Sequence, residues 1–206
     1  WRQRLIPMTS LVSTRLPSAR ARPQQCFTSE QIDALLERSE GVTHHAIAIL
    51  AFTGLRVGEL EALLWSDVKL EMGELGMLHI RRGGSSGSTK SGRDRFVPIH
   101  PRIRPIIAQL PRTNECVLPG LRARTLLSQI KRLCRELDYG PGYKTHSLRH
   151  YFVSMCAAQG VPPRVVMRWV GHQSSQVMDM YFSLHDATSE AAMKSLAEQS
   201  CIKSRD

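Results

Sequence analysis

Two pairs of residues have types and spacings that suit the binding of a phosphate group. Arg56 follows the helix-ending Gly54, and Glu59 lies three residues further on, on the same helical face. A carboxylate that holds one edge of a guanidinium orients its other edge toward an external oxyanion. His146 and Arg149 have the same spacing near the start of a predicted helix, where free N–H groups and the helix dipole favour anions. Taken alone, the first pair is better interpreted as a surface ion pair, whereas the second indicates a phosphate site.

Three further residues could supply a proton or a nucleophile. Lys90 stands near the end of the Gly- and Ser-rich residues 83–92, which predict a flexible hairpin connection. From such a segment a lysine can reach into a cleft and donate a proton, although a lone lysine is most often a solvated charge. His172 is expected at a tight turn between two helices, and Tyr181 follows nine residues later. A capping histidine with a core tyrosine, or a helix-turn-helix that reads DNA without chemistry, would also explain this pattern.

The sequence predicts no metal site. His146 and His150 are four residues apart, as in some zinc enzymes, but a nearby third ligand and the glutamate of those enzymes are missing. The five cysteines include no pair with the spacing of a zinc site, and their odd number favours free thiols in a reducing compartment.

The chain carries a large positive charge. Its 28 Lys and Arg residues exceed its 18 Asp and Glu residues, which gives a formal net charge of +10. Such an excess indicates a polyanionic partner, most often nucleic acid. The longest strongly apolar stretch, near residues 46–52, is far too short to span a bilayer, and no secretory signal is recognisable. Residues 1–25 are rich in arginine and contain no acidic residue, so we interpret them as a basic linker rather than an organelle transit peptide.

The hydrophobic pattern predicts a mainly α-helical domain with one small antiparallel β-sheet, an α+β fold. Folded structure should begin at Thr28, which has capping-box spacing with Gln31. Thr145 is a natural N-cap, and Pro162 and Pro163 suit the first turn of a helix. Strands are predicted at 66–70, 76–81 and 94–99. Helices are predicted from Thr28 onward and at 43–53, 57–64, 101–110, 123–138, 146–159, 162–170, 174–183 and 188–199.

Together, and in this order, the chemistry-bearing residues resemble the tyrosine recombinase family, which includes phage integrases and the Xer-type chromosome-dimer resolvases. The resemblance covers nearly all of residues 28–185. Glu59 matches the acidic residue that supports the first arginine of the family. The catalytic set of the family matches, in chain order, Arg56, Lys90, His146, Arg149, His172 and Tyr181.

The resemblance implies the catalytic-domain fold of this family over residues 26–206, with residues 1–25 as a basic linker or the remnant of an N-terminal DNA-clamping domain. It implies a site-specific recombinase or integrase, associated with mobile genetic elements, that cleaves and rejoins double-stranded DNA through a 3′-phosphotyrosyl intermediate. It implies chemistry without metal, ATP or another cofactor, a homotetramer on paired DNA sites, and no membrane partner. In a prokaryotic host the protein would be cytoplasmic and associated with the nucleoid.

Within that chemistry each matched residue has an expected role. Tyr181 would attack the phosphorus, the two arginines would clamp the non-bridging oxygens, and Lys90 would protonate the leaving 5′ oxygen. The two histidines would add hydrogen bonds. Two alternatives remain, a strand-relaxing activity like that of a type IB topoisomerase and a non-catalytic, DNA-binding remnant of a recombinase. The spacing through residues 145–181 favours the recombinase over the topoisomerase, and the complete catalytic set favours it over the remnant.

Overall fold

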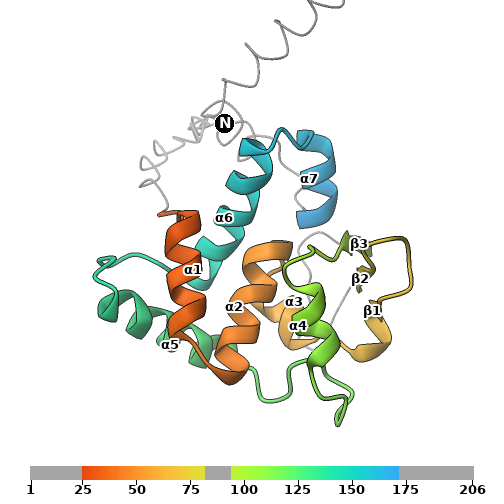
Figure 1. Cartoon of the computed structure of the whole chain (residues 1–206), viewed down its shortest axis with the longest axis horizontal. Coiled ribbons are helices and arrows are strands. Elements are labelled where there is room, and N and C mark those ends of the chain that lie inside the picture. Colours follow the sequence, from red (N-terminus) through yellow and green to blue (C-terminus); the bar gives the residue numbers. More distant parts are fainter. Residues whose placement is uncertain (1–24, 82–93, 172–206) are drawn as a thin grey trace, which may run out of the picture.

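The computed structural model describes residues 25–81 and 94–171 of the 206-residue chain. Its elements in chain order are α1 (Ser29–Arg38), α2 (Gly41–Thr53), α3 (Val57–Glu61), a 3-10 helix η1 (Trp65–Asp67), β1 (Val68–Lys69), β2 (Met77–Ile80), β3 (Arg95–Pro98), α4 (Arg104–Gln109), α5 (Ala123–Glu136), α6 (Thr145–Ala158) and α7 (Pro163–Val170). Helix α2 lies among α1, α3, α5 and α6, and the sheet lies to one side of the helices (Figure 1). The predicted mainly α fold with a small antiparallel sheet is therefore confirmed.

Helix α2 is apolar on nearly all sides and forms the centre of the core. Its residues from Ala46 to Thr53 are all buried, with at most 3% of each exposed. A helix that is hydrophobic all round needs neighbours on every side, which the surrounding helices supply. The helix ends at Gly54, whose φ of 65° lies in the left-handed region and whose N–H donates to the carbonyl of Leu50. The predicted glycine C-cap is confirmed.

Gly54 also permits the close approach of α6 and α7, which makes it a sensitive position. A Cβ atom added there would lie 2.4 Å from Cδ1 of Phe152, whereas one added at Gly73, which has a φ of 70°, would meet nothing within 4 Å. A left-handed backbone costs a non-glycine residue about 1–2 kcal/mol, and overpacking adds about 1–3 kcal/mol. We expect Gly54→Ala to lower the free energy of unfolding by about 2–5 kcal/mol and Gly73→Ala by only about 1–2 kcal/mol. Urea unfolding measures both, and equal losses would contradict the packing argument.

The sheet has the order β1-β2-β3, and both pairings are antiparallel. Ile80 of β2 pairs with Arg95 of β3. Along β3 the side chains alternate, so that Arg95 and Val97 are buried while Phe96 is 43% exposed. The inward face of β3 packs against α7. One of the side chains that the sheet directs inward is thus a charged one.

Two predicted boundaries need correction. Thr145 was the predicted N-cap, but it is the first residue of α6 and Lys144 is the N-cap. The reason is that the Ser147 hydroxyl accepts a hydrogen bond from the Lys144 amide at 3.1 Å, which starts the helix one residue earlier. The strand predicted at 66–70 is reduced to β1, because residues 65–67 form η1.

The other predicted elements within the described residues are confirmed, and several are shorter by a few residues at their ends. The capping box of α1 joins Thr28 and Gln31 as predicted, and Pro162 and Pro163 stand at the start of α7. The helices predicted at 174–183 and 188–199 lie outside the described residues. Among residues 25–81 and 94–171, no helix has the length and apolar character that crossing a membrane requires.

Candidate active site

The pair predicted from spacing, Arg56 and Glu59, forms at the start of α3. The Glu59 carboxylate accepts from the backbone amide of Arg56 at 2.8 Å and from its Nη1 at 3.1 Å. The Glu59 side chain is only 4% exposed, whereas that of Arg56 is 30% exposed. Within residues 25–81 and 94–171, Nε and Nη2 of Arg56 have no hydrogen-bond acceptor. One edge of this guanidinium is therefore held by a buried carboxylate and another is available to an external oxyanion.

A second arginine shares the same carboxylate. Nη2 of Arg95 donates to Oε2 of Glu59 at 2.7 Å, and both side chains are almost fully buried. Burial alone would raise the pKa of Glu59, but hydrogen bonding and charge from Arg95, followed by those from Arg56, hold that pKa below its ordinary value. Glu59 is therefore an anion that lies between two guanidinium groups.

Arg149 projects from α6 and is only 2% exposed. Its Nη1 donates to the carbonyl of Gly54 at 2.6 Å and its Nη2 to the carbonyl of Val170 at 2.5 Å. These carbonyls belong to the C-terminal ends of α2 and α7, where the helix dipoles are negative and favour a cation. Burial, and next the charge of Arg56, lower the pKa of Arg149 to about 9, so it remains charged at neutral pH. Two of its five N–H donors are used by the helix ends, which leaves the others for a further acceptor.

His146 lies one turn before Arg149 on α6. Its ring is in edge contact with that of His150, with 4.6 Å between the ring centroids. His146 is exposed at the surface, but the loss of solvent around its ring, and next the charges of Arg149 and Arg56, lower its pKa. The neutral imidazole is therefore favoured at neutral pH, and it can accept a proton.

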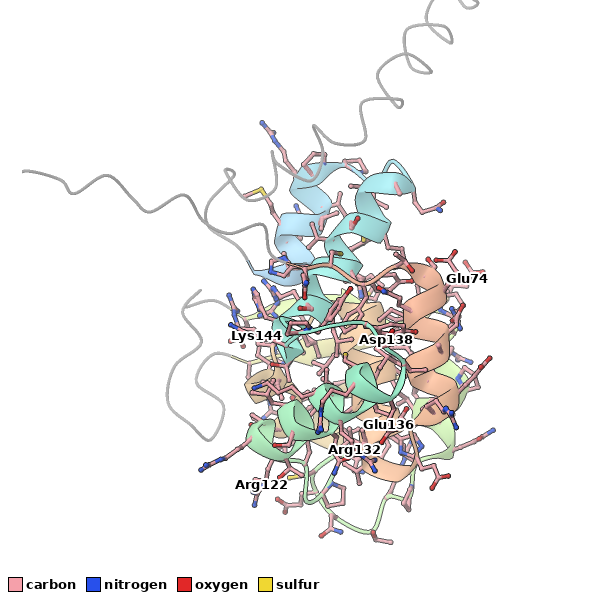
Figure 2. All side chains as sticks on the ribbon, turned by 90° about the vertical axis from the view of Figure 1, so that its left-hand side faces the viewer. Glu74, Arg122, Arg132, Glu136, Asp138 and Lys144 are labelled. Atoms are coloured by element: carbon pink, nitrogen blue, oxygen red, sulfur yellow. The ribbon has the colours of Figure 1, made fainter. Side chains whose placement is uncertain are left out.

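The structure brings four of the predicted site residues into one electrostatic cluster, Arg56, Glu59, His146 and Arg149. The charge of Arg56 acts on both His146 and Arg149, and that of Glu59 acts on Arg149. His146 and Arg149 lie in the first two turns of α6, after its N-cap Lys144, which Figure 2 labels. Within the described ranges, no three His, Cys, Asp or Glu side chains are grouped so that they could hold a metal ion. The other predicted site residues lie outside the described residues and are Lys90, His172 and Tyr181.

The cluster includes one residue that the sequence did not single out, Arg95. Besides its bond to Glu59, its Nε donates to the carbonyl of Trp169 in α7 at 2.7 Å. The available signal was its phase, because residues two apart in a strand share a face and Arg95 shares the inward face of Val97. A charged residue in phase with core residues indicates a buried ionic partner.

Comparison with protein families and curated proteins gives a consistent result. The model described as the phage integrase family matches residues 25–188, a range that includes every predicted site residue. The chain is 23% identical over 201 residues to tyrosine recombinase XerD of Halalkalibacterium halodurans, with 87% of this chain and 64% of that protein covered. It is 27% identical over 171 residues to tyrosine recombinase XerA of Pyrococcus furiosus, with 75% of this chain and 56% of that protein covered. The chain thus spans less than two thirds of the length of either relative.

Solved structures share the fold. A crystal structure of XerA recombinase aligns with a TM-score of 0.61 and 21% identity over 89% of this chain and 66% of that one. The integrase of transposon Tn1549, in complex with transposon right-end DNA, aligns with a TM-score of 0.65 and 19% identity over 86% of this chain and 67% of that one. At these identities the likeness concerns the fold.

Proposed function

The chain belongs to the phage integrase family, and from that premise we propose that it cleaves and rejoins double-stranded DNA as a site-specific tyrosine recombinase. The observation that carries the proposal is the cationic cluster. The charges of Arg56 and Arg149 both act on His146 near the start of α6, while the carboxylate of the cluster, Glu59, is shared between Arg56 and Arg95. The excess positive charge suits a phosphodiester whose transition state carries additional negative charge.

In the proposed reaction Tyr181 is the nucleophile. Its oxygen forms a bond to phosphorus, the bond from phosphorus to the 5′ oxygen breaks, and the products are a 3′-phosphotyrosyl link and a free 5′-hydroxyl. Lys90 supplies the proton that the leaving 5′ oxygen takes up, and neutral His146 is suited to accept the phenolic proton. Rejoining reverses these steps, and because the covalent link conserves the bond energy it needs no ATP.

The described tyrosines support this choice, because each is engaged in or near the core. The chain has four tyrosines. Tyr151 is 5% exposed, and Tyr143 is 9% exposed and stacked on Phe27 with 4.3 Å between the ring centroids. Tyr139 packs against the core, and loss of solvent raises its pKa further. A buried phenol, or one with a raised pKa, is a poor nucleophile at neutral pH, which favours Tyr181.

The arginines would act on the phosphate in different ways. Arg56 is exposed enough to contact a non-bridging oxygen directly, while its other edge is held by Glu59. Arg149 is fixed by two helix ends and would offer its remaining donors from within the protein. Removing a single preorganised donor of this kind typically raises the barrier by roughly 3–4 kcal/mol.

The proposed partner is double-stranded DNA, and the proposed assembly is a homotetramer on paired DNA sites. In a prokaryotic host it would act in the cytoplasm, at the nucleoid. Residues 26–206 form the proposed catalytic domain, and residues 1–25 the proposed linker to, or remnant of, a DNA-clamping domain. The family assignment and the net charge of +10 support the DNA partner.

Covalent trapping tests the proposal. The chain is incubated in EDTA with nicked duplexes tiled across the DNA that flanks its gene, so that cleavage releases a short strand and prevents rejoining. We expect a protein–DNA adduct that survives denaturation. Cleavage that requires a divalent metal and leaves no adduct would contradict the proposal. Relaxation of a supercoiled plasmid would instead indicate the topoisomerase-like activity, if that plasmid contains none of the sequences on which an adduct was trapped.

Replacement of Lys90 tests the leaving-group acid. We expect Lys90→Ala to slow cleavage of an ordinary duplex by about 10²–10⁴-fold, the usual contribution of general acid catalysis. A duplex with sulfur in place of the 5′ bridging oxygen should restore the rate to within about tenfold of the wild-type rate, because a thiolate leaves without protonation. Rapid-quench cleavage assays measure both substrates. A failure of the sulfur substrate, with DNA binding intact, would show that Lys90 has another role.

The pH dependence tests the proton acceptor. The pKa of His146 is lowered from the ordinary value of 6.5. As the pH falls, the neutral imidazole therefore persists down to the lowered pKa and becomes protonated only below it. If His146 accepts the phenolic proton, single-turnover cleavage should be independent of pH just below neutrality and should decrease on further acidification. His146→Gln should be slower and should lack this acidic limb. An unchanged limb in the variant would assign the limb to another group.

A further inference from the structure

Arg95 joins three elements that the proposed site depends on. It stands at the start of β3, and its Nη2 donates to Glu59 near the start of α3. Its Nε donates to the carbonyl of Trp169 near the end of α7. The neighbouring carbonyl, that of Val170, accepts from Arg149. The last two carbonyls of α7 are therefore held by two different arginines.

The surroundings of Arg95 leave it little freedom. Its side chain is 5% exposed, and a Cβ atom added at Gly171 would lie 3.1 Å from its Nη1. The Glu59 carboxylate is equally restricted, because Oε2 accepts from both Arg95 and the Arg56 amide while Oε1 accepts from the Arg56 guanidinium. A rotation of this carboxylate would disturb its hydrogen bonds to both the amide and the guanidinium of Arg56.

A buried ion pair at this position needs an explanation other than stability. Desolvation offsets most of the attraction within such a pair, and apolar side chains of similar volume are often as stable. An apolar residue at position 95 would suit the inward face of β3, which Val97 shares. The geometry of the arginine, with two donors directed at two fixed acceptors, instead resembles the outer residues that orient the ligands of a reactive site.

We propose that Arg95 is a positioning residue of the recombinase site, which holds the Arg56 guanidinium through Glu59 and fixes the end of α7 through Trp169. Arg95 contacts no substrate in this scheme. It sets the direction of the available edge of Arg56, and it places the chain at Gly171, from which the sequence continues directly to His172. This inference rests on the proposed function for its effect on cleavage, but the linkage between Arg95 and Glu59 can be tested without activity.

The activity test compares Arg95→Gln, Arg95→Lys and Glu59→Gln with the double variant Arg95→Gln/Glu59→Gln. We expect Arg95→Gln to slow single-turnover cleavage by about 10–100-fold, as removal of an orienting residue does, with the dissociation constant for DNA changed less than about threefold. Arg95→Lys should recover part of the rate. Because Arg95 acts on Arg56 through Glu59, the combined loss in the double variant should be smaller than the product of the two single losses. Removing both charges also avoids an unpaired buried charge, and the part of the Arg95 effect that remains in the double variant reports on its bond to Trp169.

The matched control is Arg102→Gln. Nη2 of Arg102 donates to Asp33 at 2.7 Å, the same distance as in the Arg95–Glu59 pair. The side chains of Arg102 and Asp33 are both exposed, however, whereas those of Arg95 and Glu59 are buried. We expect cleavage by this variant to match that of the wild type. Effects of Arg95→Gln and Glu59→Gln that multiply in the double variant, or a loss of DNA affinity equal to the loss of rate, would overturn the positioning role.

The test without activity follows the Glu59 carboxyl by carbon-13 NMR through a pH titration. In the wild type its pKa should lie below the ordinary glutamate value, because the attraction of Arg95 and Arg56 exceeds the effect of burial. Arg95→Gln should raise it and Arg102→Gln should not, and an unchanged value in Arg95→Gln would overturn the inference. If the wild type forms no DNA adduct, the proposed function fails while this titration still decides whether Arg95 controls Glu59.

Discussion

Tyr181→Phe should bind DNA as the wild-type chain does and form no covalent adduct. The substitution removes only the phenolic oxygen, so phosphate contacts made by the arginines remain while the nucleophile is lost. We expect adduct formation to decrease by at least roughly 10⁴-fold, the scale on which loss of a nucleophile acts in other covalent enzymes. Denaturing gels of trapped duplexes measure the adduct, and gel-shift titration measures binding.

The matched control for this variant is Tyr139→Phe. Tyr139 is a tyrosine whose side chain is partly exposed and packs against the hydrophobic core. Adduct formation by Tyr139→Phe should equal that of the wild type. An adduct of normal yield from Tyr181→Phe, or loss of the adduct in Tyr139→Phe alone, would refute the assignment of the nucleophile.

Replacement of Arg149 should produce the second large effect, and it should affect cleavage far more than binding. Arg149→Ala removes a cation that stabilises charge in the transition state, for which we expect a loss of about 10²–10³-fold in the cleavage rate. The dissociation constant for DNA should increase less than tenfold, because many other basic residues contribute to it. Equal losses of rate and affinity would make Arg149 a simple phosphate anchor.

Arg149 also has a structural role, so the effect of its replacement on stability must be measured separately from the effect on the cleavage rate. Its removal leaves the carbonyls of Gly54 and Val170 without their donor, and each buried group left unsatisfied costs about 1–3 kcal/mol of stability. Arg149→Lys keeps the charge but cannot reach both carbonyls with a planar fork. Urea unfolding of both variants and of Arg132→Ala, an exposed arginine on α5 (Figure 2), shows whether the rate loss exceeds the loss of folded protein.

The features that the sequence predicted well are those that depend on neighbours along the chain. The glycine at position 54 ends α2 in a left-handed conformation, in which its N–H donates to the Leu50 carbonyl. Arg56 reaches Glu59 because the two residues are three positions apart. Both relations involve residues that are close in sequence, so their spacing alone is enough to predict them. The capping box of α1 is a third example of the same kind.

The features that escaped prediction depend on contacts between distant segments. Arg95 donates to partners 36 and 74 residues away, and Arg149 donates to carbonyls 95 and 21 residues away. No periodicity in a single sequence indicates which strand faces which helix end. The phase of Arg95 in β3 could have shown that it is buried, but not that Glu59 and the end of α7 are its partners.

The identity of the residue that carries the DNA tests the account most directly. The trapped adduct is formed in EDTA, treated with nuclease and trypsin, and its nucleotide-bearing peptide is sequenced by mass spectrometry. We predict the linkage on Tyr181, within the peptide that spans residues 169–194. A linkage on Tyr139, Tyr143 or Tyr151, or cleavage that yields no linked peptide at all, would contradict the central claim.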